Sequence, residues 1–118
     1  MIDRREIEKV ATYIGIVSNA ESIVLFGSYA RGDARENSDV DLLIIAESNL
    51  PRFKRSRELY KLLRPYSFPM DLIVYTPEEI EKGKESPISF VSRVLQEGEV
   101  VYDRRNRHRS SVGSESPE

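Results

Sequence analysis

The sequence predicts an α/β (α+β) domain, in which helices flank a small mixed β-sheet. Three short apolar runs rich in β-branched residues, 23–26, 40–46 and 70–75, have the composition of buried strands. The segments between them carry apolar residues at helical spacing and capping residues at their ends. A chain of 118 residues suffices for one hydrophobic core. We therefore expect one domain over residues 1–103 and a tail over 104–118.

The first half of the chain predicts helices on either side of the first two strands. Apolar residues at helical spacing predict an amphipathic helix over residues 4–17, with Asp3 and Glu6 as a capping box. A short helical turn is expected over 29–33, between the two strands. One longer helix is expected over the segment from 51 to 65, because a proline opens this segment and another closes it.

The second half predicts two more helices and a last strand. A capping box in Thr76-Pro77-Glu78-Glu79 predicts a short helix directly after the third strand. Ser86-Pro87 repeats the start signal and predicts a helix over residues 87–97, with Ile88 on its apolar stripe. Gly98 stops that helix, and a short final strand is expected over 99–103.

Composition excludes several classes of protein. With 39% hydrophobic and 32% charged residues, the chain has the balance of a soluble globular protein. Its apolar runs fall short of the ~18 residues that span a bilayer. The N-terminus lacks a signal-peptide core, so we expect a cytoplasmic protein with no membrane association. The absence of cysteine excludes disulfides and thiolate-bound metals.

Charge is divided unevenly between the body and the tail. The net charge is −2, and the tail over 104–118 holds four arginines against two glutamates, so the body is the more acidic part. Nucleic-acid binding by the body is therefore not expected. The tail has almost nothing apolar to bury, which predicts disorder, and a basic arm that contacts RNA or a partner is the alternative. His108 falls in this tail and is expected to be neither ligand nor base.

A glycine-serine pair after the first strand predicts a phosphate-binding turn. Gly27 and Ser28 place backbone N–H groups and a hydroxyl where an anionic phosphate can approach closely. Arg31 is a candidate for the same phosphates, since a guanidinium stabilises charge on a leaving group. Arg35 is a weaker candidate for this role. Taken separately, the glycine-serine pair is an ordinary turn and the arginines are ordinary surface residues.

Three aspartates predict a metal site beside this turn. Asp39 and Asp41, at i and i+2, point to the same side of the second strand, and Asp71 stands at the start of the third. If these strands are neighbours, the three acids meet at one edge of the sheet and can hold two Mg²⁺ ions, with Mn²⁺ as the alternative. Asp39 and Asp41 would then bridge both ions. Asp71 would be the general base or would hold the activating ion.

The spacing of these residues resembles a known signature. Gly27-Ser28-Tyr29-Ala30-Arg31-Gly32, five further residues and then Ser38-Asp39-Val40-Asp41 resemble the motif of minimal nucleotidyltransferases in the DNA polymerase beta superfamily. The resemblance covers about residues 20–103 and includes Leu95-Gln96-Glu97-Gly98. It implies the polymerase beta-like nucleotidyltransferase fold and Mg²⁺-dependent transfer of a nucleotidyl group, usually AMP from ATP, with release of pyrophosphate. Its metal ligands map onto Asp39, Asp41 and Asp71, and its phosphate-binding pair onto Gly27 and Ser28.

The same resemblance suggests a partner. Larger relatives carry extra domains that grip the acceptor, so here a second protein or a second copy of the chain is expected to do so. Minimal nucleotidyltransferases are commonly antitoxins that adenylylate a tyrosine of a helical HEPN ribonuclease, and we expect that activity here. Two alternatives remain open. In the first alternative, the chain neutralises its partner by binding alone. In the second, it is a small-molecule nucleotidyltransferase of the aminoglycoside-modifying kind.

Overall fold

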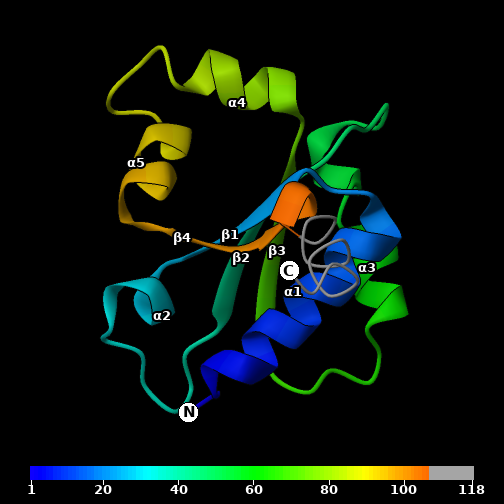
Figure 1. Cartoon of the computed structure of the whole chain (residues 1–118), viewed down its shortest axis with the longest axis vertical. Helices are drawn as coiled ribbons and strands as arrows, with labels where there is room; N and C mark the ends of the chain where they lie inside the picture. The colour runs from blue at the N-terminus through cyan, green and yellow to red at the C-terminus, as the bar shows by residue number, and fades with distance from the viewer. Residues whose placement is uncertain (107–118) are drawn as a thin grey trace, which may run out of the picture.

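Four strands form one mixed sheet in the computed structural model, which describes residues 1–106 (Figure 1). Their bounds are β1 Ser22–Phe26, β2 Val40–Ile45, β3 Met70–Tyr75 and β4 Glu99–Asp103. The strand order is β3-β2-β1-β4, with β1 antiparallel to both β2 and β4, and β2 parallel to β3. The mixed sheet is therefore confirmed. So is the adjacency of the second and third strands, on which the predicted site depends.

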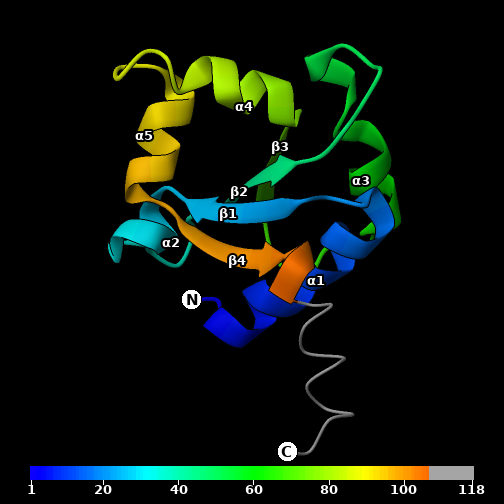
Figure 2. The ribbon, with the colours of Figure 1, turned by 45° about the horizontal axis from the view of Figure 1, so that its top comes forward.

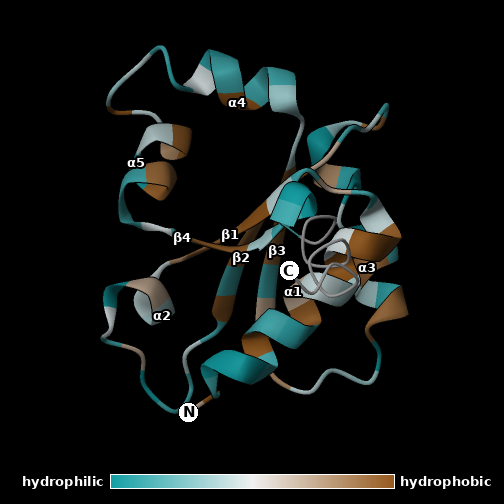
Figure 3. Cartoon of the chain, in the orientation of Figure 1, coloured by the Kyte–Doolittle hydropathy of each residue, from teal (hydrophilic) through white to brown (hydrophobic). Residues whose placement is uncertain are grey.

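Helices cover both faces of the sheet, as Figure 2 shows. On one face, α1 (Arg4–Ser18) and α3 (Arg57–Leu62) pack over a core that includes Ile7, Ile14 and Leu59. On the other face, α4 (Pro77–Gly83) and α5 (Phe90–Glu97) pack over a second core. Figure 3 shows the strands coloured mainly as hydrophobic residues and the helices as a mixture of hydrophilic and hydrophobic ones. Burial on both sides explains why the strands are almost continuously apolar.

Two helix starts test the predicted capping boxes. At α4, the Glu79 N–H donates to the Thr76 hydroxyl at 3.2 Å and the Thr76 N–H donates to the Glu79 carboxylate at 3.0 Å, which confirms the box. At α1, Asp3 caps the helix by accepting from the Arg5 N–H at 3.2 Å. The prediction that Glu6 completes a box there is wrong, because no side-chain bond of Glu6 to the cap is formed within residues 1–106.

The crossover between β2 and β3 is not the single helix that the prolines predict. It consists of a 3₁₀ turn, η1 (Arg52–Lys54), followed by the separate α3. The break lies at Arg55, whose side chain is only 8% exposed. Its guanidinium donates to the carbonyl groups of Leu50 and Val74 at 2.8 and 3.2 Å and to both carboxylate oxygens of Glu79. Those tertiary bonds override the local helical pattern.

The last helix starts later than predicted. Ser89, not Ser86, is its N-cap: the Ser89 hydroxyl accepts from the Ser92 N–H at 3.0 Å and donates to the Gly83 carbonyl at 2.6 Å. Ile88 consequently lies outside α5 and is 84% exposed, so its expected place on the buried stripe is wrong. The chain needs residues 84–89 to turn from α4 back toward the sheet.

The chain beyond β4 stays in contact with the body as far as the described residues extend. The Arg104 guanidinium donates to the Asn19 side chain at 3.1 Å, and that of Arg105 pairs with Asp103 at 3.1 Å. The rest of the predicted tail, including His108, lies outside these residues. None of the helices described in residues 1–106 combines the length and apolar character that crossing a membrane requires.

Replacing Arg55 by methionine tests the bonds that break the crossover. We expect Arg55→Met to lower the free energy of unfolding by about 2 kcal/mol, because it removes charge-assisted hydrogen bonds and leaves Glu79 without its main partner. Arg57→Met, at an exposed position of the same segment, is the matched control and should have little effect. Urea unfolding at pH 7 measures both. Equal unfolding midpoints for the two variants would show that the hydrogen bonds of Arg55 do not stabilise the crossover.

Candidate active site

Three strands bring Phe26, Asp41 and Asp71 onto one rung at one end of the sheet. Phe26 of β1 is the register partner of Asp41 of β2, and Asp41 is the partner of Asp71 of β3. Neighbouring strands lie about 4.8 Å apart, and register partners point to the same face. On that face Leu43 and Ile73, two residues further along their strands, pack under α4 and α5. The carboxylates therefore lie on the face of the sheet that these helices cover in part.

Asp39 belongs to the same group. It lies two residues before Asp41, just outside β2. The Ser38 hydroxyl accepts from the Arg35 N–H at 2.8 Å and the Ser38 N–H donates to the Arg35 carbonyl at 3.0 Å, which closes the loop that delivers Asp39 to the strand. Asp39 and Asp71 are exposed, and Asp41 is half-buried between the strands.

The electrostatics show how near these acids are to one another. The pKa of Asp41 is raised from 3.8 to about 6, first by burial and then by the negative charges of Asp71 and Asp39. The positive charge of Arg31 acts in the opposite direction. An ionised Asp41 is thus unfavourable without a cation to offset the repulsion.

The glycine-serine turn lies directly against Asp41. Gly27 has φ +76° and ψ −154°, a backbone conformation essentially restricted to glycine, and it caps the single helical turn α2 (Ser28–Arg31). A Cβ atom at Gly27 would overlap the Oδ2 atom of Asp41. The glycine is therefore required twice, by its φ and by the close approach of the carboxylate.

One backbone N–H group of this turn is bonded to a carboxylate of the chain itself. The Gly27 N–H donates to Oε2 of Glu97, the last residue of α5, at 2.9 Å. The Arg31 guanidinium lies 3.5 Å from the other oxygen of the same carboxylate. The helix start leaves the Ser28 and Tyr29 N–H groups without helical partners, since the next two N–H groups bond to the Gly27 carbonyl. The turn thus already holds one carboxylate and has further donors to offer.

Glu97 was missed by sequence reasoning, which quoted its segment without giving it a role. Glu97 is 70 positions from Gly27 in the chain, and no local pattern reports such a contact. Beside it, a hollow of about 270 Å³ lies between the turn and α5, lined in part by Arg31, Phe90 and Arg93. Its volume lies just below the range of complete small-molecule sites, so it suits part of a nucleotide.

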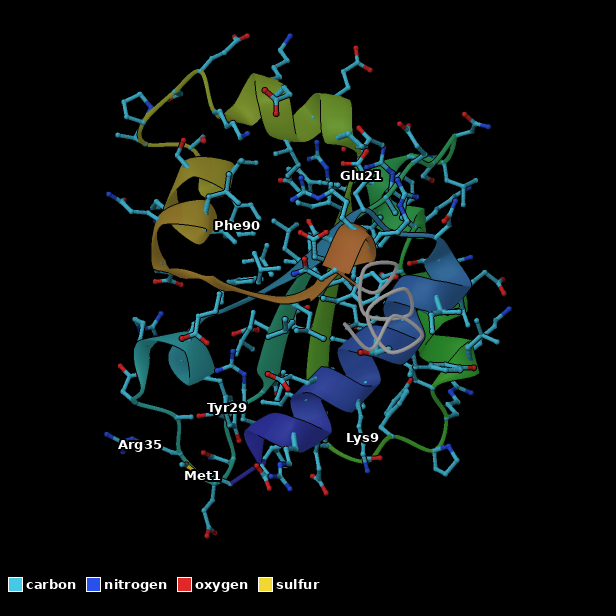
Figure 4. The ribbon with its side chains drawn as sticks, viewed as in Figure 1. Met1, Lys9, Glu21, Tyr29, Arg35 and Phe90 are labelled. Carbon is cyan, nitrogen blue, oxygen red and sulfur yellow. The ribbon has the colours of Figure 1, made fainter. Side chains whose placement is uncertain are left out.

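The two predicted arginines are placed differently. Arg31 lies in the hollow, bonds to Asp33 at 3.5 Å and acts on the charge of Asp41. Arg35 lies on the outer side of the loop after α2, while Phe90 points from α5 toward the sheet (Figure 4). Phe90 packs there on Phe26 and Tyr75, with both ring pairs 5.7 Å apart. Geometry therefore favours Arg31 over Arg35 as a phosphate ligand.

The donor set suits a hard cation that also takes oxygens from a substrate. Within residues 1–106, no three acidic, histidine or cysteine side chains are already gathered closely enough to hold an ion by themselves. Mg²⁺ commonly uses one or two protein carboxylates and completes its octahedron with phosphate oxygens and water. Asp41 and Asp71 on one rung, with Asp39 beside them, fit that kind of open site.

Comparison with known proteins identifies the family. The profile of the polymerase beta nucleotidyltransferase family matches residues 8–107. The chain belongs to this family. It is 41% identical over 81 residues to an assigned protein adenylyltransferase of Methanocaldococcus jannaschii, covering 69% of this chain and 78% of that protein. A second assigned protein adenylyltransferase of that organism is 40% identical over 93 residues, covering 72% of this chain. The chain spans 60% of the length of that relative.

Solved structures share the fold. A nucleotidyltransferase structure from Sulfolobus solfataricus superposes with a TM-score of 0.59 at 23% identity, covering 86% of this chain and 85% of that one. A toxin–antitoxin structure with AMP-PNP superposes with a TM-score of 0.58 at 21% identity, covering 98% and 86%. These likenesses confirm the predicted nucleotidyltransferase fold, in agreement with the family match.

The raised pKa of Asp41 predicts that the metal-free protein is stabilised by acid over a defined range. The folded protein binds a proton more tightly than the unfolded chain, so stability is reduced above pH 6 and recovers as the pH falls from 6 toward 3.8. Asp41→Asn should remove this dependence and raise stability at pH 7.5 by on the order of 1 kcal/mol, after discounting for solvent screening. Thermal melts in EDTA measure it, with the exposed Glu36→Gln as control. If Asp41→Asn were equally stabilising at pH 4, the gain would not come from removing the charge of Asp41.

The two glycines of positive φ provide a matched steric test of the turn. Gly27→Ala should both strain the backbone and displace the Asp41 carboxylate, whereas a Cβ atom at Gly32, with φ +87°, meets nothing within 4 Å. Gly32→Ala should therefore cost about 1 kcal/mol of stability and leave AMP-PNP affinity unchanged. Gly27→Ala should weaken AMP-PNP binding at least tenfold by calorimetry. Equal affinities for the two variants would contradict the close packing of turn and carboxylate.

Proposed function

We propose that this chain is a Mg²⁺-dependent protein adenylyltransferase that transfers AMP from ATP to a tyrosine hydroxyl of a helical HEPN-type ribonuclease and acts as its antitoxin. The observation that carries the proposal is the rung on which Asp41 and Asp71 face each other beside the Gly27 turn. Two carboxylates that repel each other lie there next to a turn that binds the carboxylate of Glu97, and both features support the proposal.

The reaction is a displacement at the α-phosphorus of ATP. The acceptor oxygen forms a bond to this phosphorus, the bond to the bridging oxygen of the β-phosphate breaks, and pyrophosphate leaves. Bound Mg²⁺ supplies neutralisation of phosphate charge and lowers the pKa of the attacking hydroxyl. Asp39, Asp41 and Asp71 are the residues that would hold two such ions, and Mn²⁺ could replace Mg²⁺ in both sites.

The chain's own residues have separate tasks in this proposal. The N–H groups and hydroxyl of the Gly27-Ser28 turn bind the β- and γ-phosphates, and Arg31 neutralises the charge that develops on pyrophosphate. Asp71, exposed on the outer strand of the pair, would accept the proton of the acceptor hydroxyl, or would instead help to hold the ion. Asp39 and Asp41 would hold the metal ions that bind the phosphates of the nucleotide.

A protein acceptor is supported by the shape of the site and by its relatives. Two of the three acids are exposed, so a side chain on another macromolecule can reach them. The relatives of about 40% identity are assigned as protein adenylyltransferases, and one structural neighbour is a toxin–antitoxin crystallised with AMP-PNP. These observations favour a protein over an aminoglycoside as acceptor, and a toxin as that protein. The tyrosine hydroxyl is the acceptor that the family resemblance implies.

Incubation with a HEPN partner tests the proposal. Incubation of the purified chain with ATP, Mg²⁺ and a helical HEPN protein that binds it should raise the intact mass of that protein by one AMP. The modified peptide should contain tyrosine. EDTA should abolish the increment. An unchanged mass, when the two proteins bind each other under the same conditions, would refute protein adenylylation. ATP consumption with an aminoglycoside and no protein would favour the small-molecule alternative.

The combined variant Asp39→Ala, Asp41→Ala separates catalysis from occlusion. If transfer of AMP neutralises the partner, this variant should bind the HEPN protein as wild type does but lose neutralisation, with AMP transfer reduced by at least a thousandfold. Growth of cells that express the toxin and each antitoxin variant provides the measurement. Full neutralisation by the variant would show that binding alone suffices.

A further inference from the structure

The hydroxyl of Tyr60 bonds to the backbone on both sides of Asp71. Tyr60 lies in the middle of α3, and its hydroxyl accepts from the Leu72 N–H at 2.8 Å and donates to the Met70 carbonyl at 3.3 Å. These are the two peptide groups that flank the Asp71 residue. No other side-chain hydrogen bond to the β3 backbone is made at this end of the strand within residues 1–106.

These bonds fall on the open edge of the sheet. β3 is an outer strand, paired only with β2. Pro69 and Tyr75 direct their carbonyl groups to the N–H groups of Val40 and Ala46, so alternate residues of β3 bond toward β2. The groups of residues 70 and 72 therefore point away from β2, where a further strand would lie. The Tyr60 hydroxyl provides one donor and one acceptor in place of that strand.

The effect of these bonds falls on the Asp71 side chain. Asp71 is exposed and no hydrogen bond holds its carboxylate among the described residues, so its direction is set by its backbone. Near the first residues of an outer strand, that backbone would otherwise have bonds on one side only and would fray readily.

We propose that Tyr60 is the positioning residue for Asp71. Its hydroxyl fixes the backbone of the first residues of β3, so that the Asp71 carboxylate stays beside that of Asp41. This inference rests on the proposed function, in which both acids hold the cation. Tyr60 touches neither nucleotide nor acceptor and acts only through Asp71. Partners that orient metal-binding side chains typically change metal affinity or activity by about 10–100-fold when they are removed.

Tyr66 provides a matched control. Its ring packs edge-to-face on the ring of Tyr60, with centroids 6.0 Å apart, and it is 43% exposed. Its hydroxyl makes no hydrogen bond within residues 1–106. Tyr60→Phe and Tyr66→Phe each remove one oxygen from the same pair of rings. Only the first removes bonds to β3, so the comparison isolates the hydroxyl at residue 60.

Two measurements on the intact chain test the inference. Hydrogen exchange of the metal-free protein should be at least fivefold faster over residues 70–73 in Tyr60→Phe and unchanged in Tyr66→Phe, at a temperature where both are folded. Mn²⁺ titrations followed by electron paramagnetic resonance, with AMP-PNP present, should give about tenfold weaker Mn²⁺ affinity for Tyr60→Phe and wild-type affinity for Tyr66→Phe. In AMP transfer, kcat should fall with KM for ATP unchanged, because the phosphate turn is untouched.

The outcomes separate this inference from the proposed function. Wild-type Mn²⁺ affinity and exchange in Tyr60→Phe would overturn the role of Tyr60 and leave the proposed function intact. Equal losses in both variants would also overturn it, since ring packing and not the hydroxyl would then be responsible. Absence of Mn²⁺ uptake by the wild-type protein with AMP-PNP would refute the proposed function and this inference together.

Discussion

The site depends on one repulsion, that between Asp41 and Asp71 across the β2–β3 pair. A parallel register keeps the two carboxylates on the same rung and the same face, and partial burial weakens the solvation of the inner one. Burial first, and this repulsion second, raise the pKa of Asp41 to about 6 in the absence of a cation. The apolar strands that follow each aspartate hold this register, because a slip by one residue would turn Leu43 and Ile73 out of the core. Hydrophobic burial thus maintains an arrangement that electrostatics alone would open.

Contacts from distant parts of the chain stabilise the surroundings of that pair. Glu97, at the end of α5, accepts from the Gly27 N–H and ties the turn to the helix that covers the same face. Tyr60, from α3 on the opposite face, bonds to the edge of β3. Gly27 adopts a backbone conformation that residues with a side chain rarely take, and its lack of a Cβ atom leaves room for the Asp41 carboxylate. Each contact links an element of the surrounding layers to one part of the rung, so the helices position the site as well as covering the core.

Local patterns in the sequence predicted the strands, the box at Thr76 and Glu79, and the neighbourhood of the aspartates, because those features follow from burial, capping and spacing over a few residues. Two of the failed predictions depended on bonds to residues outside the segment itself. The break at Arg55 follows from a guanidinium that reaches Val74 and Glu79, and the late start of α5 follows from the bond between Ser89 and Gly83. Glu97 could not be found for the same reason, since its partner lies in another part of the chain. The roles of the three aspartates as metal ligands remain predictions.

The asymmetry of the rung bears on how such a small domain selects an acceptor. Asp41 is half-buried between Phe26 and Asp71 and faces the turn that holds an anion, whereas Asp71 is exposed on an outer strand. In the proposed reaction, a nucleotide bound along the turn would occupy the inner side of the rung, and an attacking hydroxyl would approach from the outer side. No further strand pairs with β3 on that outer side within the described residues, and the Asp71 side chain is exposed there, so a hydroxyl on another macromolecule could reach it. In the proposed function, specificity would then come from the surface that presents the hydroxyl, which is the physical reason to expect a docked macromolecule rather than a free small acceptor.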